Sequence, residues 1–253
     1  MIELSKRLGA VAEQVLPGGT LADIGTDHAL LPVALVQRGH IPRAVAGDIH
    51  EGPAAAAERQ VRAAGLEDRV DVRIGNGLAV LRPGEAATIA IAGMGGGTIV
   101  DILSSGGEAL AGVRRLVLQP NIGERLVREW LLRQDWKLTA ETLLEEEGLM
   151  YEVLTADRAT DPAEAREWNE ALYEGPVDGA GAPVPRAVRL LMGPHLLRRP
   201  TELFVRKWTA YSAKLDALIE QIGRSDSLEA KKKREELSQE RNEVNEVLSW
   251  LSK

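Results

Sequence analysis

The segment Gly25-Thr26-Asp27-His28 follows a short apolar run and carries residue types that could bind a charged ligand. Gly25 lets the backbone turn sharply and come close to that ligand. The dinucleotide-binding fingerprint requires G-x-G-x-x-G, but Asp27 and His28 follow where further glycines would be needed. A carboxylate at Asp27 would repel a pyrophosphate, whereas it would suit the positively charged end of S-adenosylmethionine. A plain turn after a strand is the alternative interpretation.

Asp48 and Asn76 follow the next two apolar runs and could hold an adenosyl group. A carboxylate at Asp48 can accept hydrogen bonds from both ribose hydroxyls, which would serve NAD and S-adenosylmethionine alike. The amide of Asn76, between Gly75 and Gly77, can present a donor and an acceptor to an adenine edge. Each residue also has a structural explanation, because Asp often caps a helix and Asn-Gly is common in turns.

Four of the five residues from Gly93 to Gly97 are glycines, and they follow a fourth apolar run. This position lies beside the expected switch point of a parallel sheet, where ligands bind. Because glycines leave little side chain, we expect Gly95 and Gly96 to form the floor of a groove that admits a bulky substrate. The Asn-Pro-Pro-Tyr or Asp-Pro-Pro-Tyr motif, common here in amino methyltransferases that act on adenine, is absent.

Metal chemistry is not expected of this chain. It has no Cys, which excludes disulfides, thiolate metal sites and a cysteine nucleophile. His28 adjoins Asp27 and His50 lies near Asp48, but neither the H-x-x-x-H spacing nor a carboxylate cluster occurs.

The elements that would position these residues alternate between strand and helix. Apolar runs at residues 20–24, 44–48, 70–74, 88–92 and 115–119 predict strands, and segments 29–38, 52–65, 98–104 and 123–133 predict helices. This alternation is typical of parallel βαβ units in a doubly wound α/β sheet. Two further strands, 137–144 and 150–156, are too close for a parallel crossover, so we expect an antiparallel hairpin at the end of the sheet. Class I methyltransferases usually have this layout.

The last third of the chain predicts a helical hairpin, after a Gly- and Pro-rich loop at 175–186. In the first helix, from Thr201, apolar residues alternate at spacings of four and three, which is a heptad seam. A capping box of Asp226 and Glu229 would begin a second helix. The seam comprises Phe204, Trp208, Tyr211, Leu215, Leu218 and Ile222. In the second helix an apolar stripe continues through Leu237, Val244, Val247 and Leu251, interrupted by Arg241.

Charge is distributed unevenly along the chain, which has a formal net charge of -7. Residues 1–157 hold 15 Lys or Arg and 22 Asp or Glu, whereas residues 186–234 hold 12 basic and 5 acidic residues. The basic stretch, which includes Arg198, Arg199, Arg206 and Lys207, is either a solvated helix face or a surface that contacts phosphates. No run of about 18 apolar residues occurs, so we expect no membrane span and a cytoplasmic protein.

Taken in order, several motifs resemble those of the bacterial TrmK family, the tRNA (adenine(22)-N(1))-methyltransferases. They cover most of the chain: ADIGTDHALLP, GDIHEGP, GNGLAV, IAGMGGGTI, LVLQPN, REWL and LLMGPHLL. The resemblance implies a class I methyltransferase domain followed by a helical hairpin, with S-adenosylmethionine as cofactor and an adenine in the D-arm region of tRNA as target. It maps cofactor contacts onto Gly25, Thr26, Asp27, Asp48, Asn76, Gly93 and Met94.

Leu30 departs from the family pattern, because many members have Tyr at this position. If that ring stacks on the target base, another residue must do so here. Adenine N1 is a neutral nucleophile that needs alignment more than a base, and alignment can supply about 7–11 kcal/mol in model systems. Asp27 could stabilise the cationic product, and we name Asp27 and His28 as candidate catalytic residues. The alternative is that Asp27 only contacts the cofactor.

The expected organisation is a methyltransferase domain at residues 1–157, a connecting segment at 158–197 and a tRNA-binding helical hairpin at 198–253, with a monomer favoured. A different function remains open: a methyltransferase for a small molecule or another RNA, with the hairpin as lid or dimer arm. A non-catalytic binding module is a further alternative, against which Asp48 and Gly25 argue.

Overall fold

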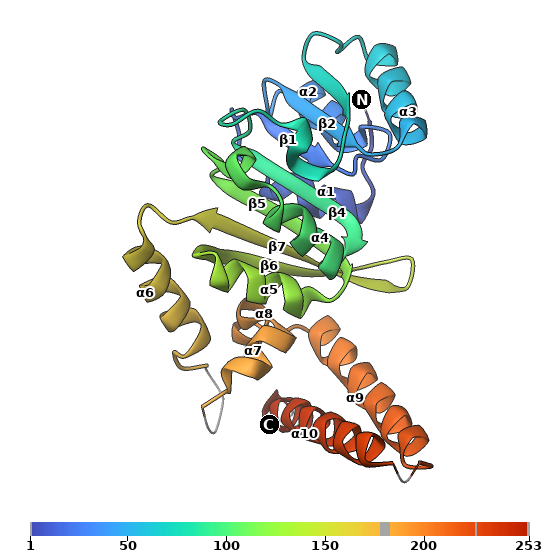
Figure 1. Cartoon of the computed structure of the whole chain (residues 1–253), viewed down its shortest axis with the longest axis vertical. Coiled ribbons are helices and arrows are strands. Elements are labelled where there is room, and N and C mark those ends of the chain that lie inside the picture. The colour runs from blue at the N-terminus through green and yellow to red at the C-terminus, as the bar shows by residue number, and fades with distance from the viewer. Residues whose placement is uncertain (1, 178–182, 226, 252–253) are drawn as a thin grey trace. The chain divides into compact units, whose positions relative to one another are not determined.

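A mixed β-sheet organises the first two thirds of the chain (Figure 1). The computed structural model describes residues 2–177, 183–225 and 227–251. Within them the sheet has seven strands in the order β3-β2-β1-β4-β5-β7-β6. The strands are β1 (Leu21–Ile24), β2 (Ala44–Asp48), β3 (Val70–Ile74), β4 (Thr88–Gly95), β5 (Arg115–Ile122), β6 (Trp136–Glu146) and β7 (Leu149–Arg158).

The first five strands are parallel, and β7 pairs antiparallel with both β5 and β6. This confirms the predicted fold class, including the closing hairpin. The turn of that hairpin is shorter than expected: only Glu147 and Gly148 separate the strands, both at positive φ, as a two-residue hairpin turn requires. The acidic residues before Glu147 therefore belong to β6.

Helices cover both faces of the sheet. They are α1 (Lys6–Gln14), α2 (Leu30–Gln37), α3 (Glu51–Ala63), α4 (Gly96–Ser104) and α5 (Glu124–Arg133), with the short 3-10 helices η1 (Gly77–Val80) and η2 (Gly107–Leu110). The strand order reverses between β1 and β4. Right-handed crossovers therefore place α2 and α3 on one face and α4 and α5 on the other. The two groups of helices leave the carboxyl ends of β1 and β4 as the switch point of the sheet.

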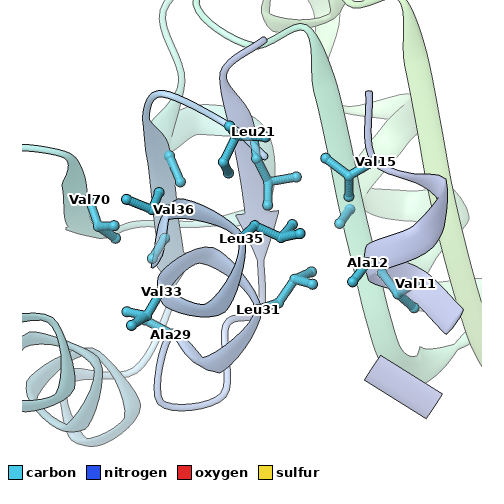
Figure 2. Packing of buried hydrophobic residues seen from close by; sticks show 14 of the residues in the cluster. Val11, Ala12, Val15, Leu21, Ala29, Leu31, Val33, Leu35, Val36 and Val70 are labelled. Carbon is cyan, nitrogen blue, oxygen red and sulfur yellow. The ribbon is translucent and has the colours of Figure 1, made fainter. Parts of the chain in front are cut away.

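A buried apolar cluster fixes α2 against the sheet (Figure 2). Val33 and Leu35 of α2 are buried together with Leu21 of β1 and Val70 of β3, and Val11 of α1 joins the same cluster. β1 is buried at every position, as expected for a parallel strand covered on both faces. The core therefore anchors both ends of the turn at 25–29, which connects β1 to α2, because Ile24 and Ala29 are buried.

The strand β4 runs further than the pattern predicts. Residues 93–95 continue it with two shifts in register against β5, at Met94 and at Gly95, and α4 begins at once at Gly96. The interval at 93–97 that the sequence analysis left between the strand at 88–92 and the helix at 98–104 is therefore absent. Gly93, at φ +78, supplies the irregularity that keeps the segment paired to β5.

The chain divides into two compact units, residues 1–166 and 167–253, and the boundary falls within α6 (Pro162–Tyr173). The second unit contains α7 (Arg186–Met192), α8 (Pro194–Arg198), α9 (Glu202–Ile222) and α10 (Leu228–Leu251). Part of the expected loop at 175–186 lies outside the described residues, as does Asp226 of the expected capping box. No helix in the described ranges is long and apolar enough to cross a membrane.

The two long helices form the antiparallel hairpin expected from the heptad seam. Trp208 and Leu215 of α9 and Val244 and Val247 of α10 are buried. The hydroxyl of Tyr211 donates to Glu240 at 2.5 Å, and Arg241, which interrupts the apolar stripe, pairs with Asp216 at 2.7 Å.

Side-chain hydroxyls cap both helices of the hairpin. Thr201 accepts from the backbone N of Phe204 at the start of α9, at 3.2 Å. At the start of α10 the Ser227 hydroxyl accepts from the backbone N of Ala230, at 3.1 Å. The observed N-cap of α10 is thus Ser227.

Candidate active site

Two adjoining cavities lie at the carboxyl ends of β1, β2, β3 and β4, where the strand order reverses. One has a volume of about 320 Å³ and is lined by Asn76 and Ile49. The other has a volume of about 270 Å³ and is lined by Asp27 and Arg7. Both cavities share Gly25, Asp48 and Met94. An extended ligand could therefore occupy both, passing between Asp48 and Met94.

A larger hollow, about 810 Å³, lies at the opposite ends of the strands. Its lining includes Pro17 and Gly18, which precede β1, and His40 and Pro42, which precede β2. Open parallel sheets bind ligands at the carboxyl ends of their strands. The two smaller cavities are therefore the better candidates, despite their size.

The turn after β1 is built around Gly25. Its φ is +74°, and an added Cβ would lie 1.9 Å from the methyl carbon of Met94. The backbone N–H groups of Gly25 and Thr26 both donate to the carbonyl of Gly47, at 2.8 and 3.0 Å. The positive φ favours glycine here, and the terminal methyl of Met94 packs directly over the turn. This contact joins the ends of β1 and β4 between the two cavities.

Asp23 lines the second cavity and was not singled out by the sequence analysis. It is 7% exposed, and the buried hydroxyl of Thr26 donates to its carboxylate at 2.6 Å. Burial raises the pKa of Asp23 to about 6, against the opposing effect of the Thr26 hydrogen bond, and the charges of Asp27 and Asp48 raise it further. Three carboxylates thus converge on one small cavity, which favours a cation there.

Asp27 and His28 differ in their relation to the cavities. Asp27 lines the second cavity with its side chain 82% exposed. The Nε2 atom of His28 lies 3.4 Å from Oδ1 of Asp27. His28 is not among the lining residues described for either cavity. A catalytic role for His28 therefore stays a prediction without support from its position.

Asp48 and Asn76, the two residues expected to contact an adenosyl group, both line the first cavity. Asp48 is half-buried, lines both cavities, and accepts from the backbone N of His50 at 2.7 Å through Oδ1. Asn76 is exposed, lines the first cavity, and makes no side-chain hydrogen bond to η1, which it precedes. Ile49, 54% exposed at the same cavity, offers apolar contact that the sequence analysis missed.

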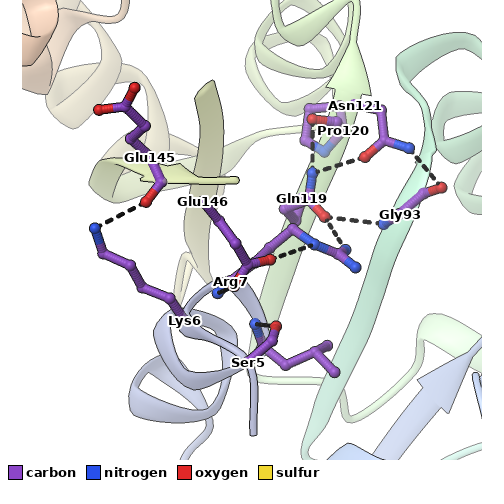
Figure 3. A network of polar contacts seen from close by, with 10 residues as sticks. Ser5, Lys6, Arg7, Gly93, Gln119, Pro120, Asn121, Glu145 and Glu146 are labelled. Atoms are coloured by element: carbon purple, nitrogen blue, oxygen red, sulfur yellow. Dashed lines mark hydrogen bonds and ion pairs between the residues drawn. The ribbon is translucent and has the colours of Figure 1, made fainter. Parts of the chain in front are cut away.

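A hydrogen-bond network of unusual completeness surrounds Gln119 (Figure 3). Its Oε1 accepts from the backbone N of Gly93 at 3.0 Å and from Nη1 of Arg7 at 2.6 Å. Its Nε2 donates to the carbonyl of Pro120 at 2.9 Å and to Oδ1 of Asn121 at 3.2 Å. Asn121 closes the loop by donating from Nδ2 to the carbonyl of Gly93, at 2.8 Å. Gln119 is fully buried, so the network locks the irregular end of β4 to β5.

Arg7 reaches this network from α1. Its guanidinium lies over the ring of Tyr151, 5.4 Å from the centroid, and Nε is 3.9 Å from Glu146. Its backbone N donates to the same Glu146 carboxylate, at 2.9 Å, which lowers the pKa of Glu146. The positive charge of the Arg7 guanidinium thus lies at the wall of the second cavity, and the carboxylate of Glu146 partly neutralises it.

The glycines of the predicted substrate floor have different surroundings. An added Cβ at Gly95 would have only the Thr98 hydroxyl near it, at 4.0 Å, and one at Gly97 would meet nothing within 4 Å. At Gly96, in contrast, it would lie 2.2 Å from the carbonyl oxygen of Gly123. Close packing of α4 on the turn before α5 thus explains Gly96, and Gly95 is the better candidate for an open floor.

The four predicted RNA-contacting residues belong to the second unit. Arg198, Arg199 and Arg206 are exposed, and Lys207 is half-buried with its ammonium 5.4 Å from the centroid of the Trp208 ring. Arg198 also donates to the carbonyl of Ala171, at 2.7 Å. The basic run Lys231–Arg234 is exposed throughout.

Among the described residues, no group of three or more His, Cys, Asp or Glu could hold a metal ion.

Comparison with known proteins identifies close relatives. The family model for TrmK, tRNA (adenine(22)-N(1))-methyltransferase, matches residues 21–246. The tRNA (adenine(22)-N(1))-methyltransferase of Bacillus subtilis is 40% identical over 248 residues, which cover 98% of each chain. The crystal structure of the B. subtilis m1A22 tRNA methyltransferase TrmK matches with a TM-score of 0.86 at 39% identity, over 98% of this chain and 100% of that one.

A second solved structure bears on the ligand. It is a candidate tRNA (m1A22) methyltransferase of Streptococcus pneumoniae in complex with S-adenosyl-L-methionine. It matches with a TM-score of 0.79 at 35% identity, over 97% of this chain and 100% of that one.

Proposed function

The chain belongs to the TrmK family of tRNA (adenine(22)-N(1))-methyltransferases, and we propose that the two adjoining cavities at the ends of β1–β4 form its active site. The resemblance and the cofactor expected from the sequence are confirmed. The protein is an S-adenosylmethionine-dependent tRNA (adenine-N1)-methyltransferase. The observation that carries the assignment of the site is the position of Asp48, which is shared by both cavities.

The residues present fit S-adenosylmethionine, whose bound form supplies an electrophilic methyl group. In the proposal Asp48 accepts from the ribose hydroxyls, and Asn76 meets the adenine edge with Ile49 against the base. The positively charged end lies in the second cavity, where Asp23, Asp27 and Asp48 provide the negative charge. Gly25, Thr26, Gly93 and Met94 shape the passage between the cavities.

Methyl transfer to adenine N1 asks little acid–base chemistry of the protein. The N1 lone pair would form the bond to the methyl carbon while the sulfur–methyl bond breaks and leaves its electron pair on sulfur. The positive charge would thus pass from the sulfonium to the adenine. The protein therefore has to align the base and tolerate a cation before and after transfer. Asp27 is suited to the second task, because its carboxylate lines the cavity and stays largely accessible.

Asp48→Ala tests this assignment. Loss of a charge-assisted hydrogen bond is worth about 1.5–3 kcal/mol, so S-adenosylmethionine should bind roughly 10- to 150-fold more weakly by calorimetry. Asp48→Asn is the matched control for local structure, because its amide oxygen can still accept from the backbone N of His50. A folded Asp48→Ala protein with unchanged affinity would remove Asp48 from the site.

We further propose that the helical hairpin and the basic stretch before it bind tRNA. The support is charge: residues 1–157 are acidic overall, whereas 186–234 carry an excess of seven basic residues. Arg198, Arg199, Arg206 and Lys207 would contact phosphates, and Lys231–Arg234 end the same basic stretch. Contacts of this kind release counterions. The logarithm of the tRNA affinity should therefore fall with the logarithm of the salt concentration, with a slope of about -0.9 per phosphate contact on duplex stems.

The test is a fourfold change of Arg198, Arg199, Arg206 and Lys207 to Gln. We expect weaker tRNA binding and a salt slope reduced by about two to four, with S-adenosylmethionine affinity unchanged. The matched control removes the same charge from the first unit, at the exposed Arg38, Arg43, Arg59 and Arg62. Equal losses in both proteins would mean that only overall charge matters, and the hairpin would then be a lid or dimer arm.

A labelling experiment separates the competing substrate classes. Tritium from the labelled methyl group should appear in bulk tRNA and not in a pool of small metabolites. We propose a monomer, and we place its activity in the cytoplasm with its tRNA substrate.

A further inference from the structure

Methylation at N1 restricts how adenine can be recognised. N1 has to face the methyl group, which leaves the N6 amino group and N7 as the neighbouring polar atoms on the other edge of the base. A side-chain amide can contact both at once, accepting from N6 and donating to N7, as Asn and Gln do with adenine in nucleic acids. Guanine would present an acceptor, O6, in place of the amino group, so such an amide would also select the base.

Asn121 is an amide with this capacity at the edge of the site. It is exposed at the end of β5, and it makes two hydrogen bonds through its side chain: it accepts from Gln119 and donates to the Gly93 carbonyl. An amide oxygen has two lone pairs and an amide nitrogen two hydrogens. One acceptor position and one donor hydrogen of Asn121 are therefore left for a ligand.

The orientation of the Asn121 amide is determined by its neighbours. The backbone N of Gly93 and the guanidinium of Arg7 can only donate, so the Gln119 oxygen must face them. The Gln119 amino group then donates to Asn121, so the acceptor must be the Asn121 side-chain oxygen. The Asn121 amino group must therefore face the Gly93 carbonyl. A flipped amide would break this chain of hydrogen bonds, so the donor and the acceptor are presented on defined sides before any base arrives.

The Asn121 amide also lies next to the proposed methyl-transfer cavity. Its hydrogen-bond partner Gly93 and the following Met94 line that cavity. In the register of the sheet Pro120 pairs with Met94, and Ile122 pairs with Gly95. Asn121 therefore stands beside the glycine floor, where Gly95 leaves room for a base.

We propose that Asn121 reads the target adenine by accepting from its N6 amino group and donating to its N7, which leaves N1 free for the methyl group. The inference rests on the proposed function and assigns the recognition of the base, for which the chain lacks the usual proline-rich motif after β4. Gln119 holds the amide in the required orientation.

A tRNA whose target adenine is replaced by 7-deazaadenine tests the donor half of this contact. The replacement removes the N7 acceptor and keeps N1 and N6. With the unmodified protein we expect kcat/KM to fall on the order of tenfold for the 7-deaza tRNA, because one hydrogen bond is lost and a donor is left unpaired. With Asn121→Ala or Asn121→Asp, both slower on natural tRNA, the 7-deaza replacement should cost nothing further.

Asn76→Ala is the matched control, since it alters an amide of the cofactor cavity and should keep the tenfold penalty. The two Asn121 variants are first shown to bind S-adenosylmethionine by calorimetry, and Asn121→Ser replaces either one that does not fold. The proposal is overturned if the unmodified protein treats both tRNAs alike, or if the Asn121 variants retain the full penalty. Failure of the unmodified protein to methylate natural tRNA would overturn the proposed function as well. Failure of the Asn121 proposal alone would leave the methylation of natural tRNA intact, so the two outcomes are distinguishable.

Discussion

Adding one methyl group at Gly96 should destabilise the protein, whereas the same change at Gly95 should not. At Gly96 the new Cβ would lie 2.2 Å from the carbonyl oxygen and 2.8 Å from the carbonyl carbon of Gly123. Both partners are backbone, so α4 and the turn before α5 have to separate by about 0.8 Å before the contact reaches even 3.0 Å. Overpacking of this kind costs about 1–3 kcal/mol, and the lower entropy of the unfolded chain offsets about 0.4–1 kcal/mol.

The expected net loss for Gly96→Ala is about 1–2 kcal/mol, or a Tm lower by roughly 2–8 °C in a chain of this size. Gly95→Ala is the control one residue away. Gly95 has φ -70° and ψ 147°, which alanine adopts freely, and its entropic gain is offset by the poorer N-cap of α4. Its Tm should stay within about 2 °C of the unmodified protein.

Thermal denaturation followed by circular dichroism measures both effects, and tRNA methylation adds a second readout. Gly95→Ala should bind S-adenosylmethionine normally and methylate tRNA more slowly, because its methyl group intrudes on the substrate floor. A Gly96→Ala protein as stable as the unmodified one would refute the packing argument. A fully active Gly95→Ala protein would show that the base does not approach this segment.

Two further predictions concern charge and capping. Because burial raises the pKa of Asp23 to about 6 and a cationic ligand favours the carboxylate, S-adenosylmethionine affinity should rise from pH 5 to pH 7 in calorimetry. Asp23→Asn should flatten that rise, and a pH-independent affinity of the unmodified protein would contradict it. Thr201→Ala removes the acceptor for the backbone N of Phe204 and should cost the second unit about 1 kcal/mol in denaturant unfolding, with no change in S-adenosylmethionine affinity. An unchanged midpoint would mean that solvent satisfies this helix end equally well.

Local patterns were sufficient to predict the sheet and several of the residues that line the two cavities. Apolar runs ended at residues such as Asp48, and a polar residue at the carboxyl end of a parallel strand must face the ligand crevice. The short spacing between the last two strands was enough to predict the antiparallel hairpin. These features depend on neighbours along the chain, which a sequence displays directly.

The remaining features depend on contacts between distant segments. Gln119 owes its role to Arg7, 112 residues earlier, and to a register shift in β4 that a run of glycines does not reveal. Gly96 looked like part of an open floor, but Gly123 lies against it. Asp23 could be identified as a site residue only once the structure showed its carboxyl group buried beside Thr26 and close to Asp27 and Asp48.

The position of the methyl group on the product tests the central claim most directly. Unmodified tRNA carrying adenine at position 22 is incubated with the protein and S-adenosylmethionine, digested, and mapped by mass spectrometry. The account predicts one added methyl group per tRNA, as 1-methyladenosine at position 22. It predicts no such product with Asp48→Ala when the S-adenosylmethionine concentration is far below the dissociation constant of that variant. Methylation of another nucleotide, or at N6 of that adenine, would contradict the account.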